Sequence, residues 1–132
     1  MQVRKFLKGY KGIDSRLSVN NSLIGGWKET AMMFLGDSDQ DKKNREICIA
    51  EARKIKAESD QLMQDMEELT NAVKQLSPLQ RKIFDLFYVQ RLNAPACCDV
   101  LKYTRNQFFF RKEEVIQELE RMLNEDETHS DL

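Results

Sequence analysis

Apolar residues recur in alternating steps of three and four over two long stretches of this chain, and no other feature narrows its possible folds as much. This heptad spacing gives a helix one apolar stripe, which a neighbouring helix must cover. The first stretch spans residues 3–34 and the second spans residues 42–75. The inward positions predicted for the first stretch are Val3, Phe6, Tyr10, Ile13, Leu17, Asn20, Ile24, Trp27, Ala31 and Phe34, and those for the second are Cys48, Ala52, Ile55, Ser59, Leu62, Met66, Leu69, Val73 and Leu76.

The residues between the two stretches are typical of a short loop. Gly36 suits a helix C-cap, and the polar residues that follow it, up to Asp41, are turn formers. A short loop between two heptad helices predicts an antiparallel, coiled-coil-like helical hairpin over residues 1–75. Inside the first helix we expect a kink or break at Gly25–Gly26, because each glycine weakens a helix by roughly 1 kcal/mol relative to alanine.

One polar residue, Asn20, interrupts the first apolar stripe. A buried polar residue in a heptad helix can fix the register or the oligomeric state at some cost in stability. We therefore expect Asn20→Leu to raise the melting temperature and to disturb association, unless a polar partner satisfies Asn20.

More apolar side chains gather near the end of the first stretch than a two-helix hairpin can cover. Leu23, Met32 and Met33 lie there beside the stripe. A large exposed apolar patch usually marks an interface, so we expect oligomerisation through the hairpin, as a homodimer. The interface residues predicted are Ile24, Trp27, Ala31 and Phe34. In the alternative, the C-terminal part of the chain folds back over this patch and leaves a monomer.

Residues 76–123 predict three further helices, each opened by a capping residue: Ser77, Asn93 or Thr104. Their side chains accept backbone N–H groups of a first turn, where the prolines at 78 and 95 are also tolerated. The apolar positions of these helices are Leu79, Ile83, Leu86 and Phe87 in the first, Cys97, Cys98, Val100 and Leu101 in the second, and Phe108, Val115, Leu119 and Met122 in the third.

The last two of these helices are joined by a very short connection at Lys102 and Tyr103. Helices joined so closely cross steeply, and a small residue is needed where they touch. Cys98 suits that position, and Leu101, Tyr103 and Phe108 are predicted to fill the wedge. This is the spacing of a helix-turn-helix, whose second helix places its first turns in the major groove of DNA.

A resemblance to known regulators rests on the stretch LSPLQRKIFDLFYVQRLNAPACCDVLKYTRNQFFFRKEEVIQEL. It is similar to the fourth region of bacterial sigma factors, which reads a promoter element. It more closely resembles the ArpU family of autolysin regulators and phage-encoded sigma-like proteins. The ArpU-like positions are Tyr103-Thr104, Phe108-Phe109, Arg111-Lys112 and Val115-Ile116, and those similar to the helical hairpin of the sigma-like proteins are Phe6-Leu7, Ile13-Asp14 and Arg16-Leu17. The resemblance implies a phage or prophage transcription regulator.

Side chains at the start of the last helix are the predicted DNA contacts. Arginine can bridge guanine, and asparagine or glutamine can bridge adenine, so residues 105–107 are expected to reach base edges. The basic residues at 102, 111 and 112 are expected to hold phosphates, which sets register rather than sequence. The DNA-binding residues predicted are Lys102, Thr104, Arg105, Asn106, Gln107, Phe109, Arg111 and Lys112.

The consecutive residues Phe108, Phe109 and Phe110 cannot all face one core from a helix. Phe108 belongs to the inward stripe, so Phe109, Phe110 or both should be partly exposed. They could contact a thymine methyl group or a protein partner, or could pack against the hairpin. The predicted partner is double-stranded DNA. In the alternative, the motif is a protein-interaction module that binds RNA polymerase or another phage protein.

The charge of the predicted DNA-binding region is small. Residues 76–123 carry eight Lys/Arg and six Asp/Glu, a net charge of +2. Phosphate neutralisation supplies most non-specific DNA affinity, so a single domain of this charge should bind weakly. That favours dimerisation, a protein partner or loss of DNA binding. Residues 124–132 carry four acidic residues and no Lys or Arg, and we expect a disordered tail there.

Several other protein classes are disfavoured. With 33% charged and 41% hydrophobic residues and no alternating apolar pattern, the chain is typical of a soluble all-α protein. No apolar run suits a membrane span or a signal peptide, so we expect the cytoplasm of a bacterial host. Cys48, Cys97, Cys98 and His129 form no zinc ligand set, and no nucleophile has a nearby base. We expect no cofactor, no small-molecule substrate and no enzymatic activity.

Overall fold

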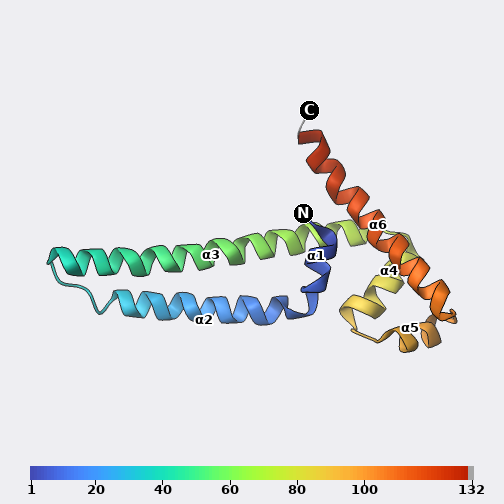
Figure 1. Cartoon of the computed structure of the whole chain (residues 1–132), viewed down its shortest axis with the longest axis horizontal. Coiled ribbons are helices and arrows are strands. Elements are labelled where there is room, and N and C mark those ends of the chain that lie inside the picture. The colour runs from blue at the N-terminus through green and yellow to red at the C-terminus, as the bar shows by residue number, and fades with distance from the viewer. Residues whose placement is uncertain (131–132) are drawn as a thin grey trace. The chain divides into compact units, whose positions relative to one another are not determined.

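The computed structural model is helical throughout the part of the chain that it describes, which is the backbone of residues 1–130 and the side chains of residues 1–124. No strand occurs in that part, so the all-α class is confirmed. In chain order the elements are α1 Val3–Lys8, the short 3-10 turn η1 Tyr10–Gly12, α2 Ile13–Ala31, α3 Asp39–Lys74, α4 Pro78–Phe84, the π-helical segment η2 Asp85–Val89, α5 Ala94–Leu101 and α6 Arg105–Ser130 (Figure 1).

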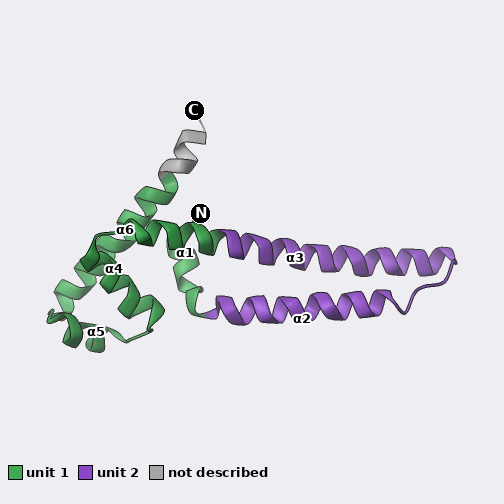
Figure 2. Cartoon of the chain, turned by 180° about the vertical axis from the view of Figure 1, so that it is seen from behind, with its two compact units in different colours: residues 1–11, 65–132 green, residues 12–64 purple. Residues whose placement is uncertain are grey.

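The chain divides into two compact units (Figure 2). Unit 2 is residues 12–64, and unit 1 combines residues 1–11 with residues 65–132. Helix α3 therefore belongs partly to each unit. These limits differ from the boundary at residue 75 that the sequence suggested. The predicted acidic tail, residues 124–132, lies outside the described side chains except for Asn124. No described helix has the length and apolar character that crossing a membrane requires.

In unit 2, α2 lies alongside the first part of α3 (Figure 1). The Asn20 side-chain amide donates a hydrogen bond to the Ser59 hydroxyl at 3.0 Å, and both residues are buried. An ion pair joins Arg16 to Glu58 at 3.1 Å. All the predicted inward positions, in both stretches and in both units, are buried or half-buried, so the two apolar stripes are confirmed. Asn20 has the polar partner on which its expected effect depended.

The expected break at Gly25–Gly26 is wrong, because α2 continues through both glycines. A Cβ added at either position would meet no neighbouring atom within 4 Å, so neither glycine is packed against another part of the chain. The cost of two glycines is too small to break a helix whose stripe is packed. The first stretch is interrupted instead between α1 and α2, where the Gly9 N–H closes the end of α1 on the Phe6 carbonyl at 3.2 Å.

One core fills unit 1, and α1 contributes to it. Val3 and Leu7 of α1 are buried together with residues of α3, α4, α5 and α6. The other buried members of this core are Leu69, Ala72, Leu76, Ile83, Phe84, Leu86, Cys97, Phe108, Val115, Ile116 and Leu119. Two of the predicted apolar positions, Leu79 and Val100, are exposed, whereas Cys97 is completely buried and Cys98 is half-buried.

The capping predictions for unit 1 are confirmed. Ser77 accepts a hydrogen bond from the Gln80 N–H at 3.2 Å, and the Gln80 side chain accepts one from the Ser77 N–H at 3.1 Å. Asn93 accepts from the Ala96 N–H at 2.9 Å. These bonds satisfy first-turn donors, which explains why α4 and α5 begin where they do.

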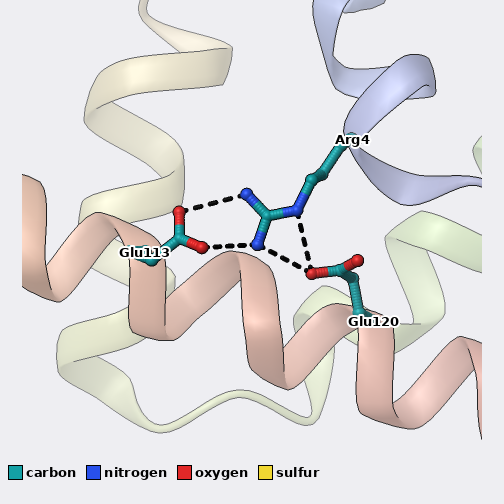
Figure 3. A network of polar contacts seen from close by, with 3 residues as sticks. All are labelled: Arg4, Glu113 and Glu120. Carbon is teal, nitrogen blue, oxygen red and sulfur yellow. Dashed lines mark hydrogen bonds and ion pairs between the residues drawn. The ribbon is translucent and has the colours of Figure 1, made fainter.

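An ion network fastens α1 to α6. Figure 3 shows the Arg4 guanidinium between two carboxylates of α6, those of Glu113 and Glu120. Arg4 Nη1 donates to Glu113 Oε2 at 3.1 Å, and Arg4 Nε donates to Glu120 Oε1, also at 3.1 Å. The hydrogen bonds from Arg4 lower the pKa of Glu113, and both glutamates raise the pKa of Arg4. The network therefore adds charged contacts to the burial of Val3 and Leu7.

Candidate nucleic-acid interface

The connection between α5 and α6 is short because Lys102 turns the chain in a left-handed conformation. Its backbone angles are φ 59° and ψ 40°, and it follows directly on the last residue of α5. The Lys102 N–H and the Tyr103 N–H both donate to the Cys98 carbonyl, the latter at 3.1 Å. These bonds close the end of α5. A residue with a Cβ is disfavoured in this conformation, so Lys102 stands where glycine is usual.

Thr104 and Gln107 form a reciprocal cap at the start of α6. The Gln107 N–H donates to the Thr104 hydroxyl at 3.2 Å, and the Thr104 N–H donates to Gln107 Oε1 at 2.9 Å. Thr104 and Gln107, two of the predicted DNA contacts, are thus both used to cap the start of α6. In this arrangement the Gln107 side chain is turned back to the Thr104 N–H, so a bidentate contact with adenine would require it to leave the cap.

The three consecutive phenylalanines of α6 point in different directions. Phe108 is completely buried, with its ring 5.8 Å from that of Phe87. Phe109 and Phe110 are 39% and 62% exposed, as the sequence predicted. Arg105 and Asn106 are also exposed at the start of the helix. The first turns of α6 therefore bury one aromatic ring and present polar and aromatic side chains to solvent.

Cations and aromatic rings alternate along one side of α6. The Arg105 guanidinium lies 5.7 Å from the centre of the Phe109 ring, and the Lys112 ammonium lies 5.4 Å from the same ring. Lys112 is also 4.4 Å from the Phe87 ring centre. Such contacts hold a cation over a ring face with modest energy. Arg105, Phe109 and Lys112 are consequently the predicted contacts that the structure brings together.

The remaining predicted DNA contacts lie beside this row. Arg111 pairs with Glu114 at 3.2 Å, and its guanidinium lies 5.9 Å from the Phe110 ring centre. Asn106 and Lys102 are exposed, and the side chain of neither makes a hydrogen bond or an ion pair among the described residues. Arg111 and Lys112 are therefore partly engaged inside the protein, whereas Lys102, Arg105 and Asn106 are the residues most available to a ligand.

The cysteines in this region show no sign of a reactive thiol. Burial raises the pKa of Cys97, which keeps its thiol protonated near neutral pH. The Cys98 sulfur lies 3.8 Å from the Thr104 carbonyl and can donate a weak hydrogen bond to it. The Cys97 thiol packs in the core of unit 1, 3.7 Å from the Leu92 carbonyl, and Cys98 packs at the α5–α6 connection, so both act as small apolar groups.

The residues predicted for an oligomer interface face α3 within unit 2. Ile24, Trp27 and Ala31 line a cleft of about 250 Å³, and Phe34 is half-buried, with its carbonyl accepting a hydrogen bond from Arg45 at 2.6 Å. We call this the α2–α3 cleft. Its lining is completed by Lys28, Cys48, Ile49, Ala52, Arg53 and Lys56. Part of the predicted interface is thus used in packing α2 on α3.

Sequence reasoning missed two features of unit 1. The Arg4 network joins residues that lie 109 and 116 positions apart, and no local spacing signals such a pairing. The position of Lys112 over Phe87 also joins two different helices, although the basic and aromatic alternation in α6 was visible. No known protein family, curated protein or solved structure matches this chain.

Proposed function

We propose that this chain is a phage or prophage transcription regulator that binds double-stranded DNA through a helix-turn-helix formed by α5 and α6. One observation carries the proposal. The left-handed turn at Lys102 joins α5 closely to α6, and the first turns of α6 then bury Phe108 while exposing Arg105 and Asn106. A helix whose first turns are polar, exposed and held by a short turn suits insertion into a major groove.

Each exposed residue has a proposed role in DNA binding. Arg105 and Asn106 read base edges, because their side chains can make bidentate contacts with guanine and adenine. Lys102, at the turn, neutralises a phosphate and sets the register. Phe109 supports Arg105 and can contact a thymine methyl group. Thr104 and Gln107 keep the helix start in place, with Arg111 and Lys112 contributing positive charge behind it.

We call the proposed helix-turn-helix the reader. Because its region has only a small net positive charge, a single copy should bind DNA weakly. A homodimer, formed through an antiparallel hairpin of α2 and α3, places two readers on one duplex and combines their affinities through effective concentration. The protein would then act in the cytoplasm of its bacterial host. Half-sites related by two-fold symmetry are the expected form of the target.

Selection from a randomised DNA duplex pool at low salt, followed by fluorescence anisotropy on an enriched duplex, tests the proposal. We expect salt-dependent binding that Arg105→Ala/Asn106→Ala weakens at least about tenfold. Arg121→Ala is the matched control, since it also removes one positive charge from α6 but beyond the proposed contacts. Equal losses in both variants, or no enriched duplex, would reject sequence reading by α6.

A second function, a protein-interaction module, is favoured by the exposed aromatic side chains. Phe109 and Phe110 stand on the surface, each with a cation beside it. Exposed aromatic rings flanked by arginine are common at the centre of protein interfaces. RNA polymerase or a phage-encoded protein would be the partner. Capture of RNA polymerase that survives nuclease treatment and is lost in Phe110→Ala would favour this function over DNA reading.

A further inference from the structure

The α2–α3 cleft combines an apolar floor with a basic rim. We call its apolar lining residues, among them Ile24, Trp27 and Ile49, the floor. The ionic residues that line it are all cations, and we call these, Lys28, Arg53 and Lys56, the rim. Unit 2 as a whole is nearly neutral in formal charge, because residues 12–64 carry eight Lys/Arg and nine Asp/Glu. The positive charge is therefore concentrated at the rim of the cleft and is not a property of unit 2 as a whole.

Two of the rim cations have no acidic partner within the described part of the chain. Lys56 pairs with Asp60 at 3.0 Å, whereas Lys28 and Arg53 make no ion pair there. Other cations of unit 2 are engaged, such as Arg16 with Glu58. An occupant of the cleft should accordingly be apolar where it meets Trp27 and acidic where it meets Lys28 and Arg53.

The segment that follows α2 has this composition. Met32, Met33 and Leu35 are 67%, 78% and 68% exposed, and Asp37 and Asp39 follow them. Neither aspartate makes an ion pair among the described residues. We call residues 32–39 the apolar–acidic segment. Its exposed apolar side chains do not occupy the cleft of their own copy, so its natural complement is the cleft of another copy.

We infer that two copies of this chain associate by docking the apolar–acidic segment of each into the α2–α3 cleft of the other. The arrangement has two-fold symmetry, since each copy offers the same cleft and the same segment. Met32, Met33 and Leu35 cover the apolar floor of the partner's cleft. Asp37 and Asp39 face Lys28 and Arg53. The inference deepens the dimer proposed above and does not depend on DNA binding.

Charge reversal on either side of this contact tests it by sedimentation and light scattering without DNA. The cleft variant is Lys28→Glu/Arg53→Glu, and the segment variant is Asp37→Lys/Asp39→Lys. In each variant alone, the cleft and the segment carry like charges. We expect the wild-type chain to have a mass about twice 15.5 kDa and each variant to have the monomer mass. Higher salt should weaken the wild-type dimer, because exposed charges are screened.

An equimolar mixture of the two variants is the decisive sample. Both contacts then join opposite charges again, so we expect a heterodimer with the mass of the wild-type dimer. Lys43→Glu/Lys54→Glu, which removes two cations of α3 that do not line the cleft, is the control and should stay dimeric. Far-ultraviolet circular dichroism checks that every variant keeps its helix content.

The possible results separate this inference from the DNA-binding proposal. A wild-type monomer at all concentrations, variants that stay dimeric, or a mixture that stays monomeric would each overturn the docking of the segment into the cleft. Anisotropy on the enriched duplex reports DNA binding separately, so loss of DNA binding in a correctly assembled dimer counts only against the α6 reader.

Discussion

Lys102 has a left-handed backbone conformation, which is unfavourable for a residue with a Cβ. A residue with a Cβ in the left-handed region costs roughly 1 kcal/mol or more relative to glycine, and Lys102 has φ 59°. We predict that Lys102→Gly raises the free energy of unfolding by about 1 kcal/mol, measured by urea denaturation. Lys102→Ala is the control, since it removes the charge but keeps the Cβ. An equal gain in both variants would place the effect in the charge and not in the backbone.

Asn20 and Ser59 form a buried polar pair within unit 2. Because the Asn20 amide donates to the Ser59 hydroxyl, we now predict that Asn20→Leu destabilises the chain by about 1–2 kcal/mol, the reverse of the effect expected without a partner. Replacing both members by apolar groups, in Asn20→Leu/Ser59→Ala, should recover most of that loss. Urea unfolding of the four chains in a double-mutant cycle measures the coupling, which would be near zero if the bond contributes nothing.

At the scale of elements, the attachment of α1 to α6 depends on the ionised state of a carboxylate. Arg4 lowers the pKa of Glu113 in the folded chain from the ordinary value of 4.5. The unfolded chain then binds more protons in that range, so this contribution is complete above the ordinary pKa and is lost as pH falls through the lowered one. We predict that Arg4→Met destabilises the chain at pH 7 and that the difference disappears in acid.

Urea unfolding at neutral pH and in acid below the lowered pKa of Glu113 measures this difference. Lys5→Met is the matched control, because it removes a neighbouring cation of α1 that makes no ion pair with Glu113 among the described residues. Its difference from the wild-type chain should be small at both pH values. If Arg4→Met destabilises the chain equally at both, the loss comes from packing of the arginine stem.

The helices that the sequence predicted well are those fixed by local chemistry. The apolar stripes and the Ser77, Asn93 and Thr104 caps depend on residues a few positions apart, so the sequence contains their full cause. The break in the first stretch could not be placed in the same way. Gly9 and Gly25 look alike in sequence, and only the burial of Val3 and Leu7 against residues far along the chain decides between them.

The candidate site also combines features that the local sequence predicts with features that it does not. The exposure of Phe109 and Phe110 follows from helical geometry once Phe108 is assigned to the inward stripe. The sequence did not show that Gln107 would be used in a cap or that Lys112 would lie over Phe87. Those details depend on rotamers and on the packing between helices, which a periodic pattern does not specify.

At the scale of the whole molecule, unit 1 is completed by residues from the start of the chain. Val3 and Leu7 are 2% and 6% exposed in its core. We predict that Val3→Ala/Leu7→Ala lowers the free energy of unfolding by about 3 kcal/mol or more, because buried apolar groups are removed. Lys5→Ala/Lys8→Ala is the control on exposed positions of α1. Thermal unfolding followed by circular dichroism measures both, and similar small shifts would mean that α1 adds little to the core.

Unit 1 is built from two separate segments of the chain, so its parts are synthesised at different times on the ribosome. Arg4 is synthesised 116 residues before its partner Glu120. At about 5–20 residues per second, the first turn of the chain waits roughly 6 to 23 s for that partner. Residues 12–64 of unit 2 are contiguous and emerge together, so α2 and α3 can pair while unit 1 is still incomplete. The residues of unit 2 can thus assemble first, and α1 meets α6 last.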